Sequence, residues 1–202
     1  GEMLGERVAT TSEINHIIEA NKENADTDKD EDGKGNEDIA NGSKMITGVA
    51  WFDENANGQR DDSEKTLSNI KVHLLNTKTN NLVKDTKGNV LEATTNDNGV
   101  YVLNNIGSGK YIVVFEYNKT QYALTKYKAE NVDESRNSDV MTNELSIENE
   151  KQQVASTDII EINNENVSNI NIGLIELKNF NFRLDKYISK ILIQKSAGTT
   201  VK

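Results

Sequence analysis

Short stretches rich in β-branched and aromatic residues follow one another from residue 45 onward. Asn, Asp and Gly bound them, as turn residues bound the strands of an antiparallel sandwich. The stretches that fit a strand are 46–52, 70–75, 90–95, 99–103, 111–117, 121–127, 154–162 and 170–175. Within 70–75, Val72 and Leu74 alternate with Lys71 and His73, which predicts one buried and one solvated face. The pattern predicts an all-β antiparallel sandwich, with no helix beyond a few turns after residue 45.

The segment before this region has a different composition. Residues 23–44 hold five Asp, three Glu, three Gly and no aromatic residue, so they cannot bury enough apolar surface to offset the entropy of ordering. Upstream of it, Ile14, Ile17 and Ile18 have the spacing of one or two helical turns, although the same run fits the end of a strand. We therefore interpret 1–44 as the tail of a preceding repeat joined to an acidic linker.

A second strand-like pattern begins after the last stretch. Phe180, Phe182 and Leu184 alternate with Asn181 and Arg183, which is typical of a strand with two different faces. The sequence thus predicts a sandwich over 45–176, with partly ordered flanking segments and the start of a following repeat at 177–202.

The amino-acid composition excludes several kinds of functional site and argues against some partners. Cysteine is absent, which excludes disulfides, thiolate zinc sites and cysteine nucleophiles. Histidine occurs only at positions 16 and 73, and neither has other ligand types at metal spacing. The formal net charge of -10 argues against nucleic acid as a partner. No apolar run has the length of a membrane span, and residues 1–10 do not resemble a signal segment, so we expect an excised fragment with no membrane contact of its own.

One motif, at residues 53–64, indicates a specific kind of binding site. Calcium takes six to eight hard oxygen ligands, and a twelve-residue loop supplies them from positions 1, 3, 5, 7, 9 and 12 around a glycine at position 6. Gly58 stands at position 6. The oxygen-bearing residues at the six ligand positions are Asp53, Asn55, Asn57, Gln59, Asp61 and Glu64. The spacing predicts a calcium loop, with a polar Asn-Gly turn as the alternative, and the strand-like flank argues against a helix-opening switch.

A partial match to the same loop begins at Asp28. Asp30, Asp32 and Gly33 take positions 3, 5 and 6, but Ile39 stands where the bidentate acid belongs. Because acidic linkers produce such patterns by chance, a solvated linker is the favoured interpretation.

Four stretches together resemble one known family. They are 48–64, which contains the calcium loop; 70–74; 94–103, with a turn-Gly-x-Tyr strand; and 109–115. This combination is similar to the B-repeat of serine-aspartate-repeat surface proteins, the SdrD B-like family, over about residues 45–176. The element 136–140 resembles the family's Asp-Ser-Asp motif, although Asn137 replaces its first acid, and 170–174 resembles its closing strand.

The resemblance implies a prealbumin-like, Cna-B-type sandwich, strung in tandem on Gram-positive cells, with calcium holding each repeat rigid. It also implies a second-site role for Asp139, with a surface turn as the alternative. Related Cna-B domains carry a Lys-Asn crosslink, but Trp51 stands where the lysine belongs, so no such bond is expected here. The flanks resemble parts of neighbouring repeats in long clostridial surface proteins.

Three functions follow in order of preference. The first is a calcium-stabilised stalk or spacer of an adhesin-like protein at the cell surface or cell wall, monomeric and in contact with neighbouring repeats of its own chain. The alternative is a domain that itself binds a host matrix protein or carbohydrate, for which Tyr117, Tyr122 and Tyr127 are candidates; core packing explains them as well. An enzyme is the least favoured, because no nucleophile elbow, phosphate loop or His-carboxylate cluster is visible.

Overall fold

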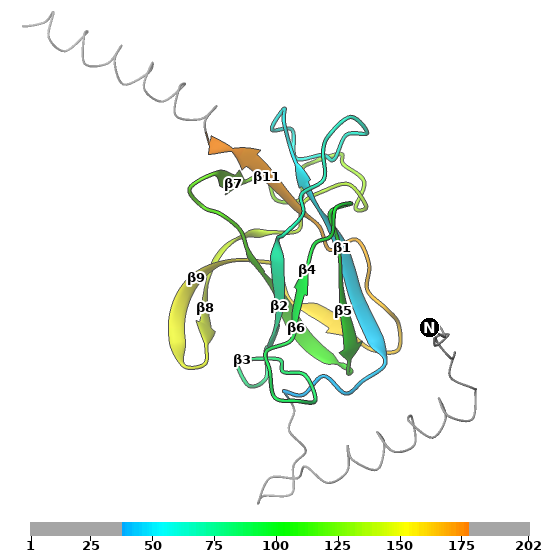
Figure 1. Ribbon diagram of the computed structural model, residues 1–202, viewed down its shortest axis with the longest axis vertical. Coiled ribbons are helices and arrows are strands. Elements are labelled where there is room, and N and C mark those ends of the chain that lie inside the picture. The colour runs from blue at the N-terminus through cyan, green and yellow to red at the C-terminus, as the bar shows by residue number, and fades with distance from the viewer. Residues whose placement is uncertain (1–37, 178–202) are drawn as a thin grey trace, which may run out of the picture.

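The computed structural model describes residues 38–177, which form two β-sheets packed face to face (Figure 1). The strands are β1 (Lys44–Phe52), β2 (Lys71–Asn76), β3 (Asn81–Leu82), β4 (Glu92–Thr94), β5 (Val100–Ile106), β6 (Gly109–Glu116), β7 (Tyr122–Leu124), β8 (Met141–Ile147), β9 (Glu150–Ser156), β10 (Ile160–Ile162) and β11 (Ile172–Glu176). No helix between residues 38 and 177 is long and apolar enough to cross a membrane.

The two sheets differ in size. The smaller has the order β5-β1-β11-β7, and the larger has the order β3-β2-β6-β9-β8, with β4 paired to β2 and β10 paired to β6. Every strand pair is antiparallel except β1 with β11, which is parallel. The predicted all-β antiparallel sandwich is confirmed, and the parallel pair is an addition that the hydrophobic pattern does not indicate.

The core lies between the facing surfaces of the two sheets. Alternate residues of the strands fill it, and Tyr101 meets Phe115 there edge to face, with ring centroids 5.7 Å apart. The fully buried members are Ile46, Ala50, Val72, Leu74, Val113, Val140, Ile162, Ile172 and Leu174. Burial of these side chains is the main force that holds the sheets together.

The prediction of one solvated face on β2 is wrong. His73 and Leu75 point away from the main core, yet they are only 8% and 2% exposed. Leu75 belongs to a second apolar cluster with Val114 and Ile147, to which residues of β8 and β9 contribute. The β8–β9 hairpin therefore covers part of the outer face of the larger sheet, and its turn is tied there by the Glu148 N–H, which donates to the Asn80 carbonyl oxygen at 2.9 Å.

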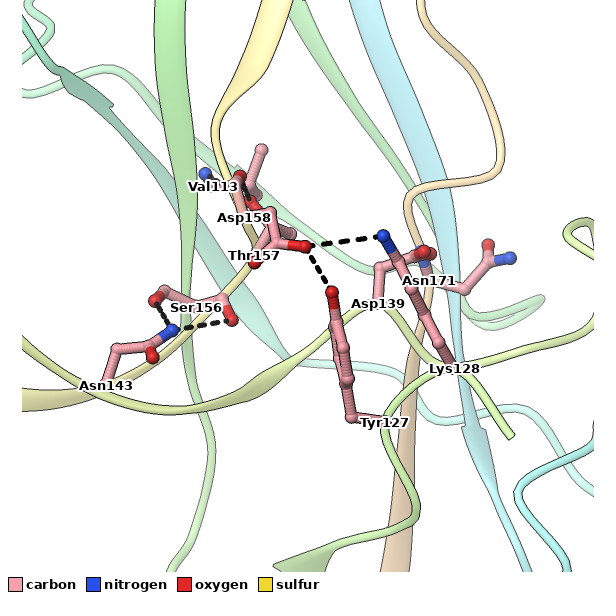
Figure 2. Close-up of polar contacts among 9 residues, drawn as sticks. All are labelled: Val113, Tyr127, Lys128, Asp139, Asn143, Ser156, Thr157, Asp158 and Asn171. Atoms are coloured by element: carbon pink, nitrogen blue, oxygen red, sulfur yellow. Dashed lines mark hydrogen bonds and ion pairs between the residues drawn. The ribbon is translucent and has the colours of Figure 1, made fainter. Parts of the chain in front are cut away.

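Two further differences concern strand bounds. The stretch 154–162 divides into β9 and β10 because Thr157 leaves the ladder and bonds Val113 with both its backbone N–H and its hydroxyl (Figure 2). Strand β8 was not predicted, since its apolar residues are separated by Thr, Asn, Glu and Ser.

Because β1 and β11 run parallel to each other, the two ends of the described chain lie at opposite ends of the sandwich. β1 begins at the N-terminal end of the sandwich, and β11 runs beside it to the opposite end (Figure 1). Residues before β1 also belong to the folded unit: the Ala40 N–H donates to the Lys84 carbonyl oxygen at 2.7 Å, and Asp38 accepts hydrogen bonds from Thr79 and Asn81. The predictions for residues 1–37 and 178–202, including the partial calcium loop at 28–33, lie outside the described residues.

Candidate functional site

The loop 53–64 starts where β1 ends. Asp53 is fully buried, and its backbone N–H donates to the Leu174 carbonyl oxygen of β11 at 2.8 Å. The first residue of the loop is thus fixed to the last strand of the sandwich as well as to the first.

The Asp53 carboxylate organises the first half of the loop. One oxygen accepts the Gly58 N–H at 2.8 Å and the Thr125 hydroxyl, and the other accepts the Asn57 N–H at 3.2 Å. Gly58 has φ +82°, and a Cβ there would lie 2.7 Å from the Cβ of Ala129. Both the backbone conformation and the close approach therefore require glycine at this bend.

Side-chain oxygens continue the winding of the loop. Asn55 Oδ1 accepts the Asn57 N–H at 3.0 Å, and Asn57 Oδ1 accepts the Gln59 N–H at 2.6 Å. These Asx turns fix successive residues of the loop in a tight bend. Glu64 closes the loop, because its two carboxylate oxygens accept the N–H groups of Glu54 at 2.9 Å and Asp61 at 3.0 Å.

Asp61 lies in the centre of this loop, surrounded by amides. Its carboxylate accepts from the side-chain N–H groups of Asn55, Gln59 and Asn57 at 2.7 to 2.9 Å, and these bonds hold the pKa of Asp61 below its usual value. Burial raises the pKa of Glu64, and the nearby carboxylates of Asp53 and Asp61 add to that effect. Negative charge is therefore concentrated here, and amide dipoles offset it only in part.

The six predicted residues of the loop are thus brought together, but as a hydrogen-bonded loop. Within residues 38–177 no cluster of three or more His, Cys, Asp or Glu side chains has the geometry to hold a metal ion. The atoms that could bind a metal ion are nevertheless all hard oxygens, and they lie on a loop bent at a glycine. Calcium prefers such ligands. The residue types fit calcium, and the side chains of Asn55 and Asn57 would have to present their oxygens in place of their N–H groups.

A second segment packs along the loop. The Arg60 N–H donates to the Arg136 carbonyl oxygen at 2.8 Å, and the Arg136 guanidinium donates to the Arg60 carbonyl oxygen and to Asp62 at 3.0 and 2.7 Å. Gln59 and Asn137 form an antiparallel bridge. The amide oxygen of Asn137 is buried without a hydrogen-bond partner, so an oxygen atom that could bind a metal ion lies beside the loop.

Asp139 is placed apart from the loop. It exchanges hydrogen bonds with Asn171 through its backbone N–H and its carboxylate, both at 2.9 Å (Figure 2). Burial raises the pKa of Asp139, and Glu134 and Asp158 contribute in the same direction. Figure 2 also shows Tyr127 and Lys128 meeting at Asp158 nearby.

Several residues that hold the site together were not predicted. Thr125 bonds Asp53 across 72 sequence positions, and Ser138 accepts the Gly173 N–H at 3.1 Å. Trp51 is fully buried, and its ring would meet a Cβ added at Gly173 at 2.5 Å. Such long-range contacts leave no signal in the local spacing of residues.

Comparison with known proteins identifies the family of the sandwich. The model of the SdrD B-like domain matches residues 44–165, more than half of the chain. The chain belongs to the SdrD B-like domain family. Serine-aspartate repeat-containing protein F of Staphylococcus epidermidis is 45% identical over 67 residues, and protein D of Staphylococcus aureus strain Newman is 42% identical over the same length. Each match covers 33% of this chain and 4% of the relative, so the chain spans a small part of these proteins.

Solved structures that match the chain include two pilins. The minor pilin GBS52 of Streptococcus agalactiae matches with TM-score 0.37 and 10% identity, covering 67% of this chain and 45% of that one. The major pilin subunit BcpA of Bacillus cereus matches with TM-score 0.34 and 15% identity, covering 67% and 30%.

Proposed function

We propose that residues 38–177 form a calcium-stabilised spacer in a surface protein of a Gram-positive bacterium, located outside the cell. Membership of the SdrD B-like family supports this proposal, as do relatives named for repeats rather than for a catalysed reaction. The observation that carries it is the parallel pairing of β1 with β11. Because the chain enters at one end of the sandwich and leaves at the other, successive repeats would line up end to end.

The same pairing determines how the sandwich resists a pulling force. A pull on residues 38 and 177 acts along β1 and β11, so the hydrogen bonds between them are loaded in shear. The paired residues, Ala50 with Ile172, Trp51 with Gly173 and Phe52 with Leu174, must then separate together rather than one after another. A spacer under tension benefits from this geometry.

Calcium would act at the end of this strand pair. Asp53 follows β1 directly and is bonded to Leu174 of β11, so an ion held by the loop would tie both strands at the point where the load arrives. The proposed ligands are the side chains of Asp53, Asn55, Asn57, Asp61 and Glu64 with the carbonyl oxygen of Gln59. Calcium would neutralise the neighbouring negative charges of Asp53, Asp61 and Glu64.

The expected gain in stability follows from linkage. An ion that binds only the folded state stabilises it by about 2.7 kcal/mol when its concentration is a hundred times the Kd. Asp139 is proposed as a ligand of a second ion, apart from the loop. The buried amide oxygen of Asn137, which has no hydrogen-bond partner, is proposed as a further oxygen ligand beside the loop.

Direct binding of a host ligand is less well supported. Tyr117 packs against the core, Tyr122 contacts Phe52 with ring centroids 6.4 Å apart, and Tyr127 donates its hydroxyl to Asp158. These three rings are engaged within the sandwich, so they do not favour a ligand surface.

Calorimetric titration of the full chain with calcium, after treatment with chelator, tests the proposal. We expect binding by the wild type and at least a tenfold weaker affinity in Asp61→Asn. Asp85→Asn is the matched control, because Asp85 is also a partly exposed turn carboxylate bonded by nearby N–H groups but lies outside the loop. Absence of heat from the wild type, or equal effects of the two variants, would contradict a calcium site at 53–64.

A further inference from the structure

The outer edge of β8 is unpaired among the described residues. The larger sheet ends at this strand, and within residues 38–177 its only strand partner is β9. A two-residue turn, with Glu148 and Asn149 at φ 51° and 69°, joins the two strands. Because such a turn is closed by a hydrogen-bonded pair and the pattern then alternates, the N–H and C=O groups of Thr142, Glu144 and Ser146 face away from β9.

This edge has few of the devices that usually prevent strand addition, and its one charged side chain is Glu144. Natural edge strands carry lysine, proline or a bulge, or are very short. Strand β8 has seven residues, none of which is Lys or Pro, and its register with β9 is continuous from Met141 to Ile147. The side chains of Thr142, Glu144 and Ser146 are exposed, so an added strand would meet polar groups on this face.

The two faces of the edge differ in chemistry. On one face Leu145 and Val154 are only partly buried, beside the partly buried Leu82 and Ile112 of the second apolar cluster. On the other face Glu144 is exposed, 3.5 Å from Lys151. The hairpin 141–156 carries three Glu and one Lys, a net charge of -2. The strand that fits this edge has alternating apolar and polar residues with positive charge on the polar side.

The chain contains such a segment. In residues 179–184, Phe180, Phe182 and Leu184 alternate with Asn181 and Arg183, and residues 178–202 hold six Lys or Arg against one Asp, a net charge of +5. We propose that residues 179–184 of a second copy of this chain add as a strand to the β8 edge. The aromatic rings would extend the second apolar cluster, and Arg183 would approach Glu144, since opposite charges stabilise neighbouring strands.

The position of residue 177 explains why a second copy is needed. Asp139 is bonded to Asn171 just before β11 begins, so β8 starts level with the beginning of β11. It then runs toward Asn80, whereas β11 carries the chain in the other direction. Asn179 lies two residues after Leu177, which is at most about 7 Å of chain, and this is too short to return residues 179–184 to the β8 edge of the same copy. The chain, predicted to be monomeric from its sequence, should therefore associate as its concentration rises.

Sedimentation velocity of the full chain over a range of concentrations tests this proposal. We expect wild-type self-association that weakens in high salt. Glu144→Pro removes one outward N–H at an edge position that tolerates proline and should raise the dissociation constant at least tenfold. Glu144→Thr keeps the N–H and should raise it by no more than about threefold, since exposed charges contribute little.

A second pair of variants tests the added segment. Phe180→Ser combined with Phe182→Ser should abolish association, whereas Asn179→Ser combined with Asn181→Ser, the same number of changes on the polar positions, should preserve it. Wild type that stays monomeric at millimolar concentration would overturn the proposal. Association that survives in the phenylalanine variant, or in Glu144→Pro with an unchanged melting temperature, would also overturn it.

Discussion

Replacing Glu64 by Gln separates the role of this side chain in the loop from its proposed role as a calcium ligand. The glutamine keeps the size of the side chain and one oxygen acceptor, but it turns an N–H group toward one of the backbone N–H groups of Glu54 and Asp61. Loss of one such hydrogen bond costs about 1 kcal/mol. Removal of a charge crowded by Asp53 and Asp61 acts in the opposite direction, so the variant in chelator should stay within about 1 kcal/mol of wild type.

The same substitution should have a larger effect in calcium. At a hundredfold excess of calcium over the Kd, the wild type gains about 2.7 kcal/mol, and a variant that binds a hundredfold more weakly gains only about 0.4 kcal/mol. For a sandwich of this size, a difference of about 2.3 kcal/mol corresponds to roughly 9 °C in Tm. We therefore expect a Tm gap that appears in calcium and nearly disappears in chelator.

Trp51 provides the readout, because it is the only tryptophan of the chain and is fully buried. Its fluorescence reports thermal unfolding of the sandwich with and without chelator. Glu150→Gln, at an exposed position outside the loop, controls for the loss of one negative charge. A Tm gap for Glu64→Gln that is equal in both conditions would refute the ligand assignment.

Four other substitutions test the contacts around the site and the hairpin. Asp53→Ala leaves buried hydrogen-bond donors without an acceptor and should lower the free energy of unfolding by about 2–4 kcal/mol even in chelator; a normal urea midpoint in chelator would contradict this role. Gly173→Ala places a methyl group 2.5 Å from the Trp51 ring and should cost about 1–3 kcal/mol, with a changed Trp51 emission in the folded state; an unchanged emission and midpoint would show that the packing is looser. Glu148→Asn replaces a residue at φ 51° by one that favours this region and should stabilise the hairpin by about 0.5–1 kcal/mol, measured by urea unfolding; a lower midpoint would count against the turn geometry. Burial raises the pKa of Asp139 above its usual 3.8, so its charge is disfavoured in the fold. In chelator, the wild type should therefore lose stability relative to Asp139→Asn as the pH rises above about 4, measured by urea unfolding; a stability difference independent of pH would refute this.

The sequence predicts most of the sandwich and the whole of the loop, for a shared reason. Stretches such as 46–52 and 111–117 gather β-branched and aromatic residues within a few positions, and the loop residues from Asp53 to Glu64 are all local to one another. The side-chain spacing therefore carries the information directly. What the loop does as a metal site still rests on that spacing, and it stays a prediction.

The features that were missed depend on contacts between distant parts of the chain. The buried outer face of β2 arises because the β8–β9 hairpin covers Leu75, and the sequence around Leu75 does not show what covers it. The Thr125 hydroxyl that bonds Asp53 and the Arg136 side chain that bonds Asp62 lie 72 and 74 positions from their partners, so no local spacing indicates these contacts. The parallel β1–β11 pair likewise follows from topology rather than from either strand's own sequence.

Single-molecule force spectroscopy on the sandwich, pulled through its two chain ends with and without chelator, tests the central claim most directly. If β1 and β11 are sheared together and calcium ties the end of β1 to the loaded end of β11, the wild type should unfold in one step at a high force that drops clearly when calcium is removed. An unfolding force that is the same in calcium and in chelator would contradict the account of a calcium-stabilised spacer.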